Sequence, residues 1–158
     1  QGRLCLRRRG TLALLRELGG PALLWLSTTG QATRVVLLVQ LSGQAARLRS
    51  GGDDVMVPLT LLAQAWRDDY ALLWQPPAEA VVDGAGRVVS IDVGWLTRRL
   101  VQAAALPASA ASSATLATLR PSIEAFQRAR GLPADGQVGA LTLIHLQKVA
   151  TPAPAVVR

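Results

Sequence analysis

The sequence predicts an α+β protein, in which a small antiparallel sheet with helices is followed by a three-helix bundle. Its 158 residues suffice for one ordinary domain or two small ones. Apolar runs at 22–26 and 34–41 lie between short polar turns, a pattern typical of neighbouring strands. From Ile91 onward, apolar residues instead recur at spacings of three and four, which indicates amphipathic helices. Short connections in the first half favour an antiparallel sheet with helices packed against it.

The sheet is expected within residues 1–78. One helix is expected over 11–18, ending at Gly19-Gly20, and another from Pro58 to about Trp66, broken by Asp68-Asp69. Residues 50–54, which include Asp53-Asp54, are predicted to form a loop. Strands are predicted at 22–26, 34–41, about 45–49, 55–57 and 70–75.

The second half divides into a short connection, a helical region and a tail. Residues 79–90 are expected to be a linker or a hairpin, 91–150 a helical module, and 151–158 a frayed tail. Within the module, helices are predicted from Ile91 to Leu106, along the apolar pattern from Leu116 through Phe126 that ends at Gly131, and over 141–149. The Ala/Ser-rich stretch 108–114 is predicted to be an exposed loop, and Pro121 to start or kink the second helix.

Composition excludes several classes of function. The net charge is +7, but the positive residues are scattered apart from Arg7-Arg8-Arg9, so a nucleic-acid partner is not expected. The chain has one cysteine, which cannot form an internal disulfide, and lacks a run of about 18 apolar residues that would span a membrane. It also lacks an initiator Met and a signal peptide, and we expect it to be a fragment whose targeting information lies upstream.

The most specific pattern lies between Ile123 and Leu146, and each of its residues has a mechanical role. Ile123 and Phe126 lie one turn apart on the core side of a helix. Gly131 suits a left-handed helix end, and Asp135-Gly136 suits a tight turn. The expected structural set is Ile123, Phe126, Gly131, Leu132, Asp135, Gly136, Val138, Gly139 and Leu146, with Val138 and Gly139 closely packed at the start of the next helix.

This pattern resembles the peptidoglycan-binding module of the three-helix kind found in cell-wall enzymes. The resemblance implies a wall-binding function and places the contacts on polar groups beside the turn. The candidate contacts are Gln127, Arg128, Arg130, Gln137, Thr142 and His145. Arginines suit this role because they pair with the carboxylates of peptide stems. The family's earlier, weaker Asp-Gly turn is replaced here by residues 108–114, so no contacts are expected there.

The first half has a second resemblance, carried by Arg16-Glu17-Leu18, by Val35-Val36-Leu37-Leu38 and by a Trp66…Tyr70…Leu73-Trp74…Pro76 segment. It is similar to the periplasmic region of the general secretion pathway protein A (ExeA-like) family of type II secretion. That resemblance implies a degenerate papain-like peptidase domain of the bacteriocin-exporter type, followed by the wall-binding module. It also implies a periplasmic fragment of an inner-membrane protein in a Gram-negative bacterium. The implied partners are peptidoglycan, general secretion pathway protein B and, indirectly, the secretin that the two proteins help to insert or multimerise. Any ATPase would lie upstream.

Peptidase chemistry is not expected in this chain. Thr33-Arg34 stands where the resemblance places the catalytic His, and an arginine cannot accept a proton at neutral pH. The only histidine, His145, lies in the other module, and Cys5 is expected to be a small buried apolar residue. One His and one Cys also make no zinc site, and neither Asp53-Asp54 nor Asp68-Asp69 is expected to bind calcium, so no metal or cofactor is expected.

Two other functions remain open from the sequence. The chain could be the wall-targeting module of a cell-wall hydrolase, or a protein-interaction scaffold without wall binding. A homo-oligomer also remains open, because a sheet that begins inside a larger domain would leave an edge free for another chain.

Overall fold

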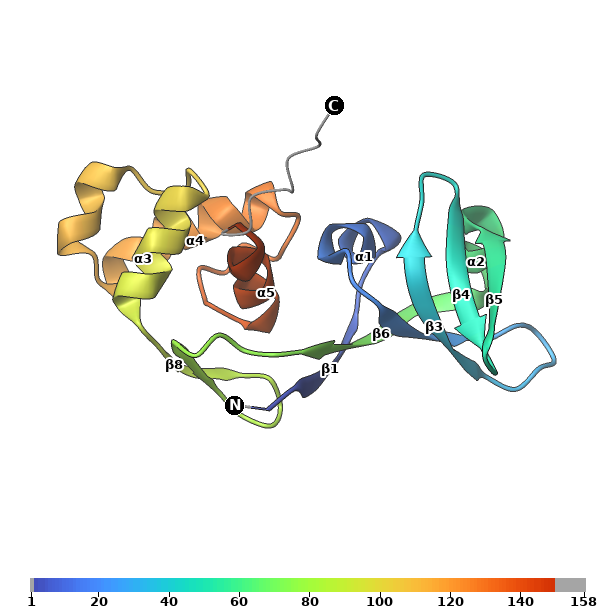
Figure 1. Ribbon diagram of the computed structural model, residues 1–158. Coiled ribbons are helices and arrows are strands. Elements are labelled where there is room, and N and C mark those ends of the chain that lie inside the picture. Colours follow the sequence, from blue (N-terminus) through green and yellow to red (C-terminus); the bar gives the residue numbers. More distant parts are fainter. Residues whose placement is uncertain (1, 150–158) are drawn as a thin grey trace, which may run out of the picture. The chain divides into compact units, whose positions relative to one another are not determined.

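The computed structural model describes residues 2–149 and divides into two compact units. One unit spans Cys5–Trp74, and the other contains the described residues from Gln75 on together with those before Cys5. The first is built on a six-stranded sheet and the second contains three α-helices (Figure 1). This confirms the predicted α+β class. No helix among the described residues is long and apolar enough to cross a membrane.

The sheet unit has strands in the order β1-β6-β2-β3-β4-β5. The pairings of β6 with β2, β2 with β3, β3 with β4 and β4 with β5 are antiparallel. Two short helices accompany the sheet. The elements are β1 (Leu4–Arg9), α1 (Leu12–Leu18), β2 (Ala22–Leu26), β3 (Arg34–Leu41), β4 (Ala45–Ser50), β5 (Asp53–Pro58), α2 (Leu59–Ala65) and β6 (Trp66–Trp74).

One face of the sheet forms the core of this unit. Leu24 lies opposite Val36 on β3 and opposite Tyr70 on β6, and Leu24 and Tyr70 are fully buried. Leu15 of α1 and Leu62 of α2 are also buried, so the helices complete the core on this face. Because side chains alternate along a strand, the neighbours of these residues lie on the opposite face, here called the outer face.

The predicted helix over 11–18 is confirmed, with its ends where the sequence placed them. The Thr11 hydroxyl accepts a hydrogen bond from the Leu14 amide at 3.2 Å, which caps the helix. Gly19 ends it in the left-handed conformation, with φ of 60°, and its amide donates to the Leu15 carbonyl.

The two Asp pairs do not lie where the sequence predicted. Asp53-Asp54 belongs to β5 rather than to a loop, because Arg49 on β4 binds the Asp54 carboxylate at 2.6 Å and holds the pKa of that carboxyl below its ordinary value. Asp68-Asp69 lies inside β6 and does not break α2. The helix instead ends at Ala65, and the chain turns directly into β6, with Asp68 in the left-handed region at φ of 66°.

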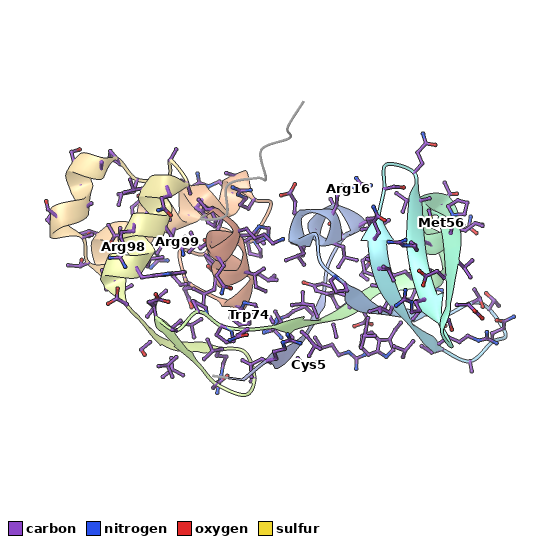
Figure 2. All side chains as sticks on the ribbon, in the orientation of Figure 1. Cys5, Arg16, Met56, Trp74, Arg98 and Arg99 are labelled. Carbon is purple, nitrogen blue, oxygen red and sulfur yellow. The ribbon has the colours of Figure 1, made fainter. Side chains whose placement is uncertain are left out.

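Cys5 is exposed, so the prediction of a buried cysteine is wrong. It lies on β1, where the next residue, Leu6, points into the core. Strand alternation therefore turns the Cys5 side chain away from the core (Figure 2).

The helical unit begins with a hairpin, so residues 79–90 are not an extended linker. β7 (Ala80–Val82) pairs with β8 (Val88–Ile91), and the Asp83 carboxylate organises the turn between them. This carboxylate accepts hydrogen bonds from the backbone and side chain of Arg87, which hold the pKa of Asp83 below its ordinary value.

Three helices follow, and their boundaries correct several predictions. Ile91 closes β8, so α3 (Val93–Gln102) starts two residues later, capped by the Asp92 side chain, and it ends before Leu106. Residues Ala108–Ser113 form a short 3-10 helix, η1, where the sequence predicted an exposed loop. The remaining helices are α4 (Leu116–Ala129) and α5 (Ala140–Val149). The expected tail, 151–158, lies outside the described residues.

Pro121 lies inside α4 rather than at its start. A capping box at Thr115 and Thr118 begins the helix earlier: the Thr115 hydroxyl accepts from the Thr118 amide, and the Thr118 hydroxyl accepts from the Thr115 amide. The two hydroxyls therefore satisfy helix-start amides that would otherwise lack partners.

The core face of the sheet can be tested at β2. We expect Leu24→Ala to lower the free energy of unfolding by roughly 2–5 kcal/mol, because it leaves a cavity beside Tyr70. Amide hydrogen exchange at Leu38, on the neighbouring strand, measures this loss in the intact chain. Leu23→Ala is the matched control, since Leu23 is 40 % exposed. Equal effects of the two substitutions would contradict this assignment of the core face.

Candidate functional site

The Asp135-Gly136 turn that the sequence singled out is present and closely held. The Asp135 carboxylate accepts a hydrogen bond from the Gln137 amide at 2.9 Å, and Gly136 has a φ of 68°, which an L side chain rarely adopts. A Cβ at Gly136 would also lie 2.6 Å from Cγ of Arg120. Only glycine fits at the point where this turn passes α4.

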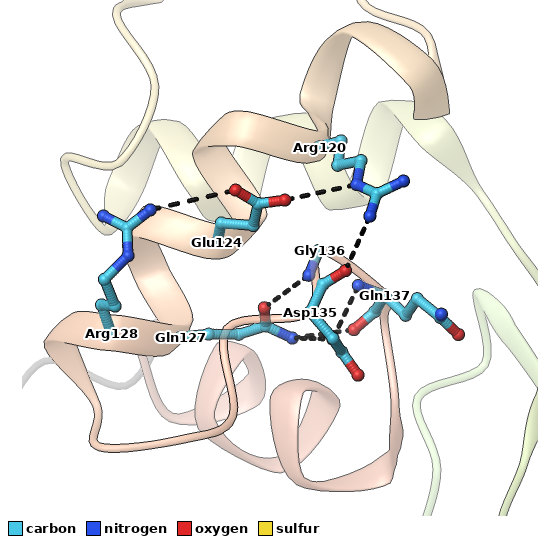
Figure 3. A network of polar contacts seen from close by, with 7 residues as sticks. All are labelled: Arg120, Glu124, Gln127, Arg128, Asp135, Gly136 and Gln137. Atoms are coloured by element: carbon cyan, nitrogen blue, oxygen red, sulfur yellow. Dashed lines mark hydrogen bonds and ion pairs between the residues drawn. The ribbon is translucent and has the colours of Figure 1, made fainter.

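The Gln127 side chain reaches from α4 to the residues of the turn (Figure 3). Its Nε2 lies 3.0 Å from Oδ1 of Asp135, 2.8 Å from the Gln137 carbonyl and 3.2 Å from the Thr142 hydroxyl. Its Oε1 accepts from the Gly136 amide at 3.0 Å. The Gln127 amide thus supplies hydrogen-bond partners to Asp135, Gly136 and Gln137 of the turn and to Thr142 near the start of α5.

Three of the six candidate contacts are therefore buried, and we correct the expectation that they face a ligand. Gln127 is 2 % exposed, and its amide is fully engaged by the protein's own groups. Thr142 and His145 are 3 % and 2 % exposed, on the inward side of α5. A buried side chain cannot reach a polymer as large as the cell wall without opening the module.

The other three candidates, Arg128, Arg130 and Gln137, lie at the surface or near it. Arg128 follows Glu124 by one turn, with an N···O separation of 3.9 Å, and the Arg130 guanidinium lies 5.6 Å from the centre of the Phe126 ring. The Gln137 side chain is exposed, while its backbone carries the hydrogen bonds of the turn.

Sequence reasoning missed Arg120. Its guanidinium lies 3.2 Å from the Glu124 carboxylate and 3.4 Å from the Asp135 carbonyl, beside the turn (Figure 3). Arg120, Glu124 and Arg128 are spaced four apart on one side of α4, a spacing that could have revealed the row. Here we call Arg120, Arg128 and Arg130 the arginine row. Because Glu124 is the one carboxylate shared by two of its members, the row keeps an excess of positive charge.

A second candidate surface is a hollow of about 250 Å³ between α3 and η1. Its lining is largely apolar, with one positive charge from Arg98. The expected loop is here a 3-10 helix that forms one wall of this hollow. The lining residues are Thr97, Arg98, Val101, Gln102, Ala108 and Ala111.

The structural set of the motif occupies the core and the turns. Ile123, Phe126, Leu132 and Leu146 are buried, and Gly131 ends α4 with a φ of 65°. Gly139 differs from the expectation of close packing, because a Cβ there would meet nothing within 4 Å. Its backbone instead links the turn to α5: its amide donates to the Gln137 carbonyl and its carbonyl accepts from the Leu143 amide.

The residue types that hold metal ions are scattered in the part of the chain that the structure describes. No three His, Cys, Asp or Glu side chains come together within residues 2–149 to hold a metal ion. Cys5 and His145 belong to different units.

The Gln127 network can be tested by substitution. We expect Gln127→Ala to destabilise the helical unit by about 2–4 kcal/mol, because it leaves the Gly136 amide without its acceptor and removes three donor contacts. Amide exchange at Leu143 measures the change. The control is Gln137→Ala, whose side chain is exposed and takes no part in the network. A similar loss in both variants would contradict the role of the Gln127 amide.

Comparison with known proteins agrees with this geometry. Residues 90–146 match the family model described as putative peptidoglycan binding domain, which covers α3, η1, α4 and most of α5. The chain is also 30% identical over 146 residues to general secretion pathway protein A of Aeromonas hydrophila. That alignment covers 92% of this chain and 26% of the relative, so the chain spans about a quarter of that protein.

A solved structure resembles the chain as well. It is a periplasmic domain of the EpsAB fusion protein of the Vibrio vulnificus type II secretion system, with 26% sequence identity and a TM-score of 0.49. The match covers 93% of this chain and 64% of that one. The two findings agree on what the chain is similar to: it resembles part of general secretion pathway protein A over nearly its whole length, and its residues 90–146 match the model of a putative peptidoglycan binding domain.

Proposed function

We propose that this chain is a non-catalytic, periplasmic region of a type II secretion protein that binds peptidoglycan through its helical unit. The observation that carries the proposal is the family match over 90–146, together with an intact turn at Asp135-Gly136. The similarity to general secretion pathway protein A along 92% of the chain supports the secretion setting.

Wall contact is assigned to the arginine row and to Gln137. The buried Gln127 amide fixes the turn, and the turn holds the Gln137 side chain and the Arg120 guanidinium at the surface. Guanidinium groups form paired hydrogen bonds with carboxylates, which peptidoglycan stem peptides carry. In this proposal the motif residues build the surface and the arginines supply the attraction.

The wider role follows from the same similarity. We propose that the parent protein sits in the inner membrane, and that wall binding positions it while it acts with protein B. The two would help the secretin to insert or multimerise.

Cosedimentation with purified, insoluble peptidoglycan tests wall binding. We expect the wild-type chain to pellet with the wall, and Arg128→Glu with Arg130→Glu to reduce the bound fraction several-fold, because each change turns attraction for stem carboxylates into repulsion. The charge-matched control is Arg16→Glu with Arg34→Glu, which alters two exposed arginines of the sheet unit by the same total charge.

The results of this experiment distinguish the arginine row from the hollow between α3 and η1 as the wall-binding surface. Loss of binding in the Arg128/Arg130 double variant but not in the control supports the arginine row. Loss only in Arg98→Glu would assign binding to the hollow between α3 and η1 instead. A wild-type chain that stays in the supernatant while a known wall-binding protein pellets would overturn wall binding, and would favour a scaffold function.

A further inference from the structure

The sheet unit contains a hollow that wall binding does not use. It measures about 430 Å³ and lies on the outer face of the sheet, at one end of four neighbouring strands. Its lining combines two arginines, an indole ring, two hydroxyls and one carboxylate. These residues are Arg7, Trp25, Ser27, Thr33, Arg67 and Asp69.

The strands themselves build this hollow. Arg7 follows the buried Leu6 on β1, Trp25 follows the buried Leu24 on β2, and Asp69 precedes the buried Tyr70 on β6. Strand alternation therefore points Arg7, Trp25 and Asp69 to the outer face together.

Two hydrogen bonds fix the margins of the hollow. The Ser27 amide donates to the Ala65 carbonyl at 2.7 Å, and Nε1 of Trp66 donates to the Asp69 carbonyl at 2.7 Å. These two bonds fix the backbone beside the lining residues. A backbone that is already fixed favours a preformed site.

The charges in the hollow favour an anion. The Arg7 guanidinium lies 4.3 Å from the centre of the Trp25 ring, a stacking arrangement that orients its plane and leaves its N–H edge able to donate. Within the described residues, neither the Arg7 nor the Arg67 guanidinium has a carboxylate within 4.0 Å. Two guanidiniums face one carboxylate, Asp69, so the lining carries an excess of positive charge.

Apolar side chains continue the outer face beside the hollow. Val35 pairs with Trp25 and is 49% exposed, and Leu23, two residues along β2, is 40% exposed. A ligand that fills the hollow with a carboxylate can therefore cover large apolar side chains next to it. Stem peptides of the wall supply carboxylates but no large apolar side chain, so this combination suits a protein segment better.

We propose that the outer face of the sheet unit is a second binding site, which takes an acidic segment of a partner protein. A carboxylate of that segment sits between Arg7 and Arg67, and a neighbouring large apolar residue covers Leu23 and Val35. The residues of this site and those of the arginine row belong to different units. The two binding proposals can therefore be tested independently.

The test uses the whole chain and two synthetic peptides. One is acetylated and amidated Leu-Glu-Phe-Glu-Leu, and the other has Gln at both Glu positions. We expect the acidic peptide to shift the indole N–H resonance of Trp25, assigned through Trp25→Phe, and to bind about tenfold more tightly than the Gln peptide. Arg7→Ala with Arg67→Ala should abolish that preference. Arg8→Ala is the control, because Arg8 follows Arg7 on β1 and alternation places it on the other face.

The result can overturn each part of the proposal. Equal binding of the two peptides, or a preference that survives in the folded Arg7/Arg67 double variant, removes the anion site. If that variant does not fold, the wild-type comparison of the two peptides and the Trp25 shift decide the question. A soluble wall stem peptide that shifts Trp25 as strongly as the acidic peptide would contradict the assignment to a protein segment.

Discussion

The geometry of the helical unit depends on one side-chain amide, that of Gln127. It is buried, and it bonds to the Asp135 carboxylate, the Gly136 amide, the Gln137 carbonyl and the Thr142 hydroxyl. A buried amide is tolerated only when its donors and acceptor are satisfied, so the turn, α4 and α5 must meet in this one arrangement. The same constraint requires glycine at 136 and keeps the Arg120 guanidinium beside the turn. The surface proposed to bind the wall is a consequence of this interior network.

Sequence reasoning was most successful where a local pattern has a local cause. The helix over 11–18, the strands at 22–26 and 34–41 and the turn at Asp135-Gly136 follow from capping, β-branched runs and turn chemistry. It failed where the conformation of a segment depends on contacts with residues far away in the sequence. The Asp pairs lie in strands because of a cross-strand arginine at Asp54 and a left-handed residue at Asp68. Gln127, Thr142 and His145 are polar, so the sequence placed them at the surface; only the structure shows that they are buried inside the module.

The arginine side chains are arranged differently in the two units. In the helical unit, Arg120 and Arg128 lie along one helix and share the Glu124 carboxylate, an arrangement that suits repeated, weak contacts with a polymer. In the sheet unit, Arg7 and Arg67 converge on one hollow beside exposed Leu23 and Val35, which suits a single short segment. A region with both could hold the wall and a protein partner at the same time.

We propose that peptidoglycan contacts the turn-side surface of the helical unit, and this contact can be observed residue by residue. Its most direct test is a backbone NMR titration of the chain with a soluble, stem-bearing fragment of peptidoglycan. We expect the amides of Arg120, Arg128, Arg130 and Gln137 to shift in proportion to bound fragment, while the buried Leu143 and the sheet unit stay unchanged. Shifts confined to α3 and η1, or no shift in the helical unit at saturating fragment, would contradict it.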